Sequence, residues 1–303
     1  MIDTARRAAY EALSAVMRDG AYTGLALKKH IKDTLSDADK RFASTLVRTT
    51  LENLLYIDYS LNKFITAKRV HGSVRNVLRL GACQILFMNV SDYAAVSESV
   101  KLVKKIKPQM SGFVNAVLRK LSDNKSDIDY PAGDSAYALS IRHSYPEWIC
   151  QKFIDEYDVA FTKDLLSYQG DKGTSVRDNT IIDGSLTDEL DRLSLSYEPG
   201  EIEDSYVIQG LSGIENLELF TSGKIAVQSK SAMKAVLAAR ISEGDKLLDC
   251  CAAPGGKSAY AAALCDNSIN IVAWDIHEHR VDMTNANFKR LGVKNAKAVL
   301  HDA

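Results

Sequence analysis

The stretch LLDCCAAPGGKSAY, residues 247–260, decides the fold of the C-terminal part of this chain. Its apolar beginning predicts a short buried strand that ends at Asp249 and Cys250, and the residues from Gly256 onward predict a helix. The loop between them contains only small residues and one proline. Such a loop lets a ligand approach the backbone and the N-terminal end of the helix.

The sequence on both sides of this stretch alternates between helix and strand patterns. A helix is expected at 227–240, a second strand at 270–275, a helix at 278–292 that Gly292 terminates, and a third strand at 296–303. The order strand–helix–strand–helix–strand predicts a parallel, doubly wound α/β sheet of the Rossmann-like type.

Three kinds of cofactor-binding loop are possible interpretations of this motif. Gly256-Lys257-Ser258 resembles the end of a phosphate-binding P-loop, but Cys251 stands where that motif needs its first glycine. A dinucleotide-binding loop needs GxGxxG, and here only the adjacent pair Gly255 and Gly256 is present. A loop for S-adenosylmethionine fits better, because that cofactor has no pyrophosphate to bind.

Acidic residues end the next two predicted strands. Asp275 ends the second strand, where a carboxylate can accept both ribose hydroxyls of an adenosine. Asp302 ends the third strand, where it can accept a hydrogen bond from the adenine amino group. The predicted cofactor-binding residues are therefore Cys251, Ala252, Ala253, Pro254, Gly255, Gly256, Lys257, Asp275 and Asp302.

The first 125 residues predict a helical domain with its own core. Apolar residues recur at helical spacing over residues 4–121, and Ser36 with Asp39 has the pattern of a helix N-terminal cap. Gly81 within one apolar stripe would allow two helices to approach closely. The polar stretch 122–134 predicts a linker.

A small α+β connecting domain is expected at 132–220. Helices are predicted at Pro146–Tyr157 and Val159–Tyr168, followed by short strands in TSVRDN, SYVIQG and KIAVQ. The predicted domains are thus 1–125, all-α; 132–220, α+β; and 221–303, the incomplete beginning of an α/β fold.

Charge is distributed unevenly along the chain. Residues 60–125 contain twelve basic and three acidic residues, whereas residues 171–220 contain three basic and twelve acidic ones. This asymmetry favours a polyanionic partner that docks on one face. Lys101, Lys104 and Lys105 share one side of a predicted helix and are the candidate RNA-binding residues.

Composition excludes several other classes of protein. Hydrophobic residues make up 46% and charged residues 25%, as in an ordinary globular protein. No apolar run is long enough to span a membrane, and no signal peptide is recognised, which predicts a cytoplasmic protein without membrane contact. A monomer is expected. The five scattered cysteines predict reduced thiols rather than disulfides or a metal site.

Several motifs resemble a known family. CAAPGGK, residues 251–257, resembles the cofactor motif of RNA cytosine-5 methyltransferases of the NOL/NOP/Sun type, as do Arg280 and Arg290-Leu291-Gly292. The segments VQSKSA and RHSYPEW resemble the regions that precede this motif in that family. VRNVLRLGACQILFMN, AAVSESVKLVKK and SGFVNAVLRKL resemble the RNA-binding factor NusB. The combination resembles the RsmB/Sun (Fmu) enzymes. One departure is Asp178, which stands between Arg177 and Asn179 where family members have a hydrophobic residue.

The resemblance implies an activity. It implies S-adenosylmethionine-dependent methylation of carbon 5 of a cytosine in small-subunit (16S) ribosomal RNA, in which a cysteine thiolate adds to carbon 6. It also places the nucleophilic cysteine beyond Ala303, so no catalytic residue and no activity are expected in residues 1–303. Cys250 and Cys251 are interpreted as packing residues of the cofactor loop. The alternative is a non-catalytic RNA-binding or assembly module that keeps a vestigial cofactor fold.

Overall fold

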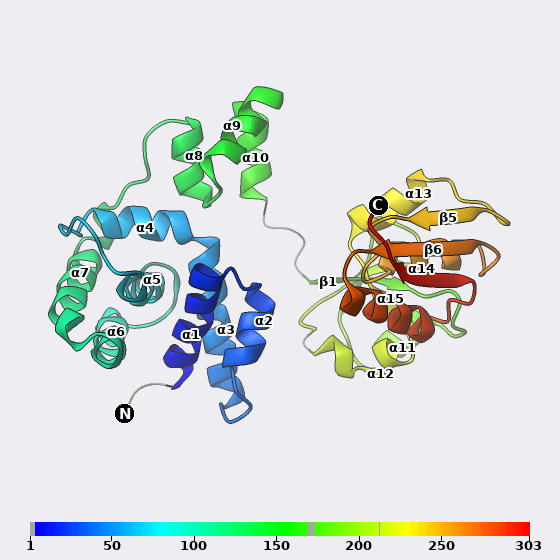
Figure 1. The fold of residues 1–303 in the computed structure, drawn as a ribbon, viewed down its shortest axis with the longest axis horizontal. Helices are drawn as coiled ribbons and strands as arrows, with labels where there is room; N and C mark the ends of the chain where they lie inside the picture. The colour runs from blue at the N-terminus through cyan, green and yellow to red at the C-terminus, as the bar shows by residue number, and fades with distance from the viewer. Residues whose placement is uncertain (1–3, 169–172, 212) are drawn as a thin grey trace. The chain divides into compact units, whose positions relative to one another are not determined.

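The computed structural model describes residues 4–168, 173–211 and 213–303 (Figure 1). The chain divides into two compact units with the boundary between Gln169 and Gly170. This boundary falls inside the segment 132–220 that the sequence pattern groups as one connecting domain. Each unit has its own core and is described separately.

The first unit is entirely helical among its described residues. Its first seven α-helices form a bundle: α1 Thr4–Asp19, α2 Thr23–His30, α3 Asp37–Glu52, α4 Leu54–Asn62, α5 Gly72–Phe87, α6 Asp92–Ile106 and α7 Ser111–Asp123. The 3-10 turns η1 Pro108–Met110 and η2 Lys125–Asp127 precede and follow α7. The predicted cap is present, since the Ser36 side chain accepts a hydrogen bond from the Asp39 amide at the start of α3.

Helix α5 lies at the centre of this bundle. It packs against α1, α3, α4, α6 and α7, and Figure 1 draws it end-on among its neighbours. Gly81 makes this arrangement possible: a Cβ atom there would come within 2.5 Å of Leu118 on α7 and 2.7 Å of Ser99 on α6. The sequence prediction of close helix contact at Gly81 is confirmed.

Three more helices complete the first unit: α8 Ala136–His143, α9 Glu147–Glu156 and α10 Val159–Ser167. The last two confirm the predicted helices, whereas α8 was not predicted. Ala136, Leu139, Cys150 and Leu166 form the small core of this helical group. Helix α8 also contacts α4, which joins the group to the bundle.

The second unit begins with a mixed region around an antiparallel sheet of order β2-β3-β1-β4. Its elements are β1 Thr174–Asp178, α11 Leu186–Arg192, β2 Tyr197–Pro199, β3 Ser205–Ile208, η3 Ile214–Asn216, α12 Glu218–Thr221 and β4 Ile225–Val227. The predicted strands TSVRDN, SYVIQG and KIAVQ correspond to β1, β3 and β4. The charged residue at 178 is accommodated because the Lys224 ammonium lies 2.8 Å from the Asp178 carboxylate.

A parallel three-stranded sheet of order β5-β6-β7 follows. Its elements are α13 Lys230–Ala238, β5 Lys246–Asp249, α14 Gly256–Leu264, β6 Asn270–Asp275, α15 Glu278–Arg290 and β7 Ala296–Leu300. Gly292 follows α15 with a φ of +71°, as expected for a glycine that terminates a helix. The predicted alternation of strands and helices is confirmed.

Helices α14 and α15 both cover the face of this sheet that carries Ile271 and Ala273. Right-handed crossovers between strands that follow one another in sheet order place their helices on the same side. On the other face, the side chains of Leu248 and Val272 are 48% and 44% exposed. In the described residues, then, helices cover one face of the sheet, whereas a doubly wound sheet carries them on both.

No helix in the described ranges is long and apolar enough to cross a membrane. Across the same ranges, no group of three or more His, Cys, Asp or Glu side chains is arranged to hold a metal ion.

Candidate functional site

The candidate cofactor loop begins at the carboxyl end of β5 and ends where α14 begins. Asp249, the last residue of β5, organises it. One carboxylate oxygen accepts a hydrogen bond from the Cys251 amide at 3.3 Å, and the other accepts one from the Ser258 hydroxyl at 2.7 Å. The two bonds connect the start of the loop to the first turn of the helix. This role of Asp249 was not predicted from the sequence, although an acidic residue directly before a small-residue loop is a signal for it.

The two glycines of the loop, Gly255 and Gly256, differ in how much space surrounds them. Gly255 has a φ of +89°, and a Cβ atom there would lie 2.9 Å from both Thr284 and Phe288 of α15. Gly255 is therefore required for the loop to pack on that helix. At Gly256, a Cβ atom would meet nothing within 4 Å. The first residue of α14 thus faces open space.

The side chains of the loop alternate between packing and exposure. Ala252 and Gly255 are buried, and the Ala252 amide donates to the Trp274 carbonyl of β6 at 3.0 Å. Cys251, Pro254 and Lys257 are exposed. Small side chains and free backbone at the N-terminus of a helix are suited to a ligand that binds the main chain closely.

The two predicted acids lie at the same edge of the sheet as the loop, because parallel strands end together. Asp275 is 8% exposed, accepts a hydrogen bond from the His277 amide at 3.1 Å, and lies 3.5 Å from the Arg280 guanidinium. Its orientation is therefore fixed before any ligand arrives. Asp302 is exposed and follows the end of β7 by two residues.

The five cysteines are distributed over three environments. Cys83 and Cys150 are buried, and burial raises the pKa of both thiols, that of Cys83 to about 11. Burial also raises the pKa of Cys265, which follows α14 at the end of the helix away from the loop. Cys250 and Cys251 are exposed, at the loop itself.

The candidate RNA-binding lysines are all exposed on α6, but their surroundings differ. Lys101 is paired with Glu98 at 2.6 Å. Lys101 and Lys104 line a groove of about 450 Å³ between α6 and α7, together with Tyr93, Asn115 and Arg119. Lys105 is not one of the groove residues. The groove residues on α7 were not identified from the sequence.

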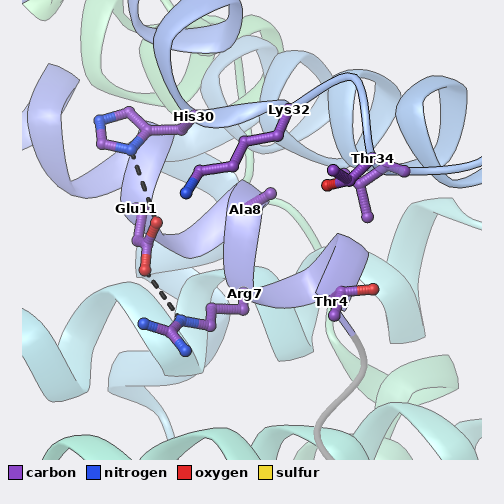
Figure 2. A pocket seen from close by; sticks show the side chains of 8 residues that line it. Thr4, Arg7, Ala8, Glu11, His30, Lys32 and Thr34 are labelled. Atoms are coloured by element: carbon purple, nitrogen blue, oxygen red, sulfur yellow. Dashed lines mark hydrogen bonds and ion pairs between the residues drawn. The ribbon is translucent and has the colours of Figure 1, made fainter.

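A second polar pocket of about 280 Å³ lies between α1 and the segment that follows α2 (Figure 2). Glu11 bridges two basic groups there: Arg7 Nε lies 2.9 Å from one carboxylate oxygen, and His30 Nδ1 lies 3.6 Å from the other. Lys32 points into the same space. None of these residues was predicted from the sequence to be functional.

Comparison with protein families gives two matches. Residues 3–123 match the NusB family, and residues 236–303 match the family described as 16S rRNA methyltransferase RsmB/F. The second match contains the whole candidate cofactor loop, Asp275 and Asp302.

Curated relatives match over nearly the full chain. The probable ribosomal RNA small subunit methyltransferase B of Bacillus subtilis is 29% identical over 98% of this chain and 68% of its own length. The ribosomal RNA small subunit methyltransferase B of Escherichia fergusonii is 26% identical over 95% of this chain and 67% of its own length. The chain thus spans about two thirds of the length of these relatives.

Among solved structures, the crystal structure of PH0851 is similar in fold, with a TM-score of 0.75 and 20% identity over 100% of this chain and 70% of that one. In one chain, a match to the NusB family is thus followed by a match to the 16S rRNA methyltransferase RsmB/F family, and curated relatives named ribosomal RNA small subunit methyltransferase B match across both regions.

Proposed function

We propose that this protein takes part in S-adenosylmethionine-dependent methylation of carbon 5 of a cytosine in 16S ribosomal RNA. The observation that carries the proposal is the loop between β5 and α14, which combines a pre-organised backbone, an open helix N-terminus and the match to the RsmB/F family. The curated relatives, named as small-subunit ribosomal RNA methyltransferases, support the substrate class.

The residues at this edge of the sheet fit such a cofactor. The open space at Gly256 admits a ligand next to the first turn of α14, and Asp249 keeps that turn and the loop together. Asp275 offers a fixed carboxylate for the ribose hydroxyls, and Asp302 an acceptor for the adenine amino group. When bound, S-adenosylmethionine would supply a methyl group carried on a sulfonium. Transfer of the methyl group leaves a neutral thioether, so this leaving group needs no proton from the protein.

RNA docking is assigned to the basic face of α6. Lys101, Lys104 and Lys105 would contact phosphates, and in the groove Arg119 adds a further cation while the exposed Tyr93 offers a ring for base stacking. Lys104 is the strongest candidate of the three lysines, since it lines the groove and Lys101 shares its charge with Glu98.

None of the five cysteines in residues 1–303 is assigned as the nucleophile. Cys83 and Cys150 are inaccessible, and their raised pKa disfavours the thiolate. Cys265 lies at the wrong end of α14, about 13 Å along the helix axis from its first residue. Cys250 and Cys251 lie at the cofactor loop itself, whereas the nucleophile must approach a different carbon of the base from the methyl donor.

Calorimetric titration of S-adenosylmethionine into the purified protein, with a parallel titration of a 16S ribosomal RNA fragment, tests the proposal. Binding of both ligands is expected. Binding of RNA without the cofactor would instead support a non-catalytic RNA-binding or assembly module. Transfer of labelled methyl groups by a protein of the relatives' full length, mapped by base analysis, tests the cytosine carbon 5 assignment.

A further inference from the structure

We infer that Asn287 of α15 is a positioning residue that fixes the cofactor loop, and that Arg290 holds Asn287 in this role. The inference rests on the proposed function in one respect: it takes the loop to be the cofactor-binding element. The contact by which Asn287 holds the loop does not depend on which ligand the loop binds.

The central contact joins the side chain of Asn287 to the middle of the loop. The Asn287 amide nitrogen donates a hydrogen bond to the Pro254 carbonyl at 2.9 Å. Pro254 lies between the buried Ala252 and Gly255, whose backbones form the turn that leads into α14. A bond to this carbonyl therefore sets the direction in which the loop enters the helix.

Arg290 determines which way the Asn287 amide faces. Two guanidinium nitrogens donate to the Asn287 side-chain oxygen, Nη2 at 2.8 Å and Nε at 3.2 Å. Because that oxygen accepts from a cation, the amide is held with its NH₂ group toward Pro254. If the Asn287 amide were rotated by 180°, its NH₂ group would face the N–H groups of Arg290, and two hydrogen-bond donors would meet.

Arg290 is in turn anchored to the antiparallel sheet of the same unit. Its Nη1 donates to the Phe220 carbonyl at 2.6 Å and to the Ile225 carbonyl at 3.1 Å, and its guanidinium lies 4.0 Å from the centre of the Phe220 ring. Burial lowers the pKa of Arg290, but an arginine remains charged at neutral pH. A continuous path of polar contacts thus runs from β4 through Arg290 and Asn287 to the loop.

The rest of α15 supports the same contact. Thr284 and Phe288 lie on the side of the helix that meets Gly255, and Asn287 lies beside them at helical spacing. Packing at Gly255 limits how close the loop can come, and the Asn287 bond limits how far it can move away. Without this bond, the middle of the loop would depend on packing at Gly255 and on the Ala252–Trp274 and Asp249 hydrogen bonds on either side of it.

The experiment compares two asparagine variants of the same helix. Asn287→Asp keeps the size of the side chain and its acceptor for Arg290 but cannot donate to Pro254. Asn285→Asp is the matched control, because the described hydrogen bonds of the Asn285 side chain go to β7: it donates to the Ala298 carbonyl at 3.3 Å and accepts from the Ala298 amide at 3.0 Å. Hydrogen exchange measured by mass spectrometry on the full chain reports on the loop and on β7 in one experiment.

The two variants should give opposite patterns. Asn287→Asp is expected to raise the exchange rate of residues 251–258 about tenfold and leave β7 unchanged, whereas Asn285→Asp should raise exchange in β7 and leave the loop unchanged. If the loop in Asn287→Asp exchanges as in the wild type, or if both variants raise loop exchange equally, Asn287 does not position the loop.

Affinity for S-adenosylmethionine provides the second readout. Asn287→Asp is expected to bind about tenfold more weakly than the wild type and more weakly than Asn285→Asp, even if the two variants lose the same thermal stability. Equal affinity in Asn287→Asp and the wild type would refute the link between loop position and binding. Absence of binding in the wild type would refute the proposed function, while the exchange comparison would still decide the role of Asn287.

Discussion

At the scale of single residues, Asp275 is the acid whose surroundings are best defined. It is nearly buried, and the His277 amide and Arg280 orient it. Asp275→Ala removes two hydrogen bonds that a ribose would make, so binding of S-adenosylmethionine should weaken by roughly 2–3 kcal/mol. Calorimetry measures the change, and Asp275→Asn separates the loss of charge from the loss of the side chain. Unchanged affinity in both variants would remove Asp275 from the site.

A second prediction at this scale concerns Cys83 and the pH dependence of the free energy of unfolding. Burial raises its pKa from the ordinary 9.0 to about 11, so the unfolded chain releases this proton at lower pH than the folded one. Stability is therefore fully present below pH 9 and lost as pH rises from 9 to 11, by roughly 2 kcal/mol from this group. Urea unfolding at pH 8 and pH 10.5 should show a smaller loss in Cys83→Ala than in the wild type. Parallel losses in the two proteins would contradict the prediction.

At the scale of secondary-structure elements, the α6–α7 groove is the proposed RNA-docking face of the helical unit. Reversing Lys101, Lys104 and Lys105 to Glu together should weaken RNA binding and reduce the slope of log affinity against log salt, by about 0.7 for each lost phosphate contact to a single strand. The groove further predicts that Lys104→Glu has a larger effect than Lys105→Glu on the same helix. A salt slope that none of these changes alters would show that the lysines only face solvent.

At the scale of the whole molecule, the two units differ in how their cores are closed. The helical bundle buries one large cluster from all of its helices, whereas the β5-β6-β7 sheet is covered on one face and its strand β5 is paired only by β6 among the described residues. Exposed apolar strands open more readily. Hydrogen exchange should show strong protection over residues 4–123 and weaker protection from Leu247 onward.

The positions of the cysteines in the whole molecule predict the activity of the purified 303-residue chain. The proposed function assigns none of its cysteines as the nucleophile that adds to carbon 6 of cytosine, so this chain is expected to transfer no methyl group to RNA even where it binds S-adenosylmethionine. Labelled methyl on cytosine carbon 5 after incubation with this chain would contradict the assignment and make Cys250 or Cys251 the nucleophile.

Much of this protein was readable from the sequence alone, because the signals are local. Helical spacing of apolar residues predicts the bundle, Gly81 predicts the close contact between its helices, and the strand–loop–helix pattern at 247–260 predicts the loop with its two glycines. These features depend on which residues are neighbours along the chain or one helical turn apart. The resemblance to the RsmB/Sun enzymes rests on the same local motifs.

Only the tertiary structure could decide which distant groups meet. It brings the Pro254 carbonyl to Asn287, 33 residues away, and the Phe220 carbonyl to Arg290, 70 residues away. It also places Arg119 of α7 in the groove beside Lys104 of α6. Nothing in the spacing of these residues foretells such contacts, because they depend on how helices and strands pack, and packing is determined by the burial of many side chains together.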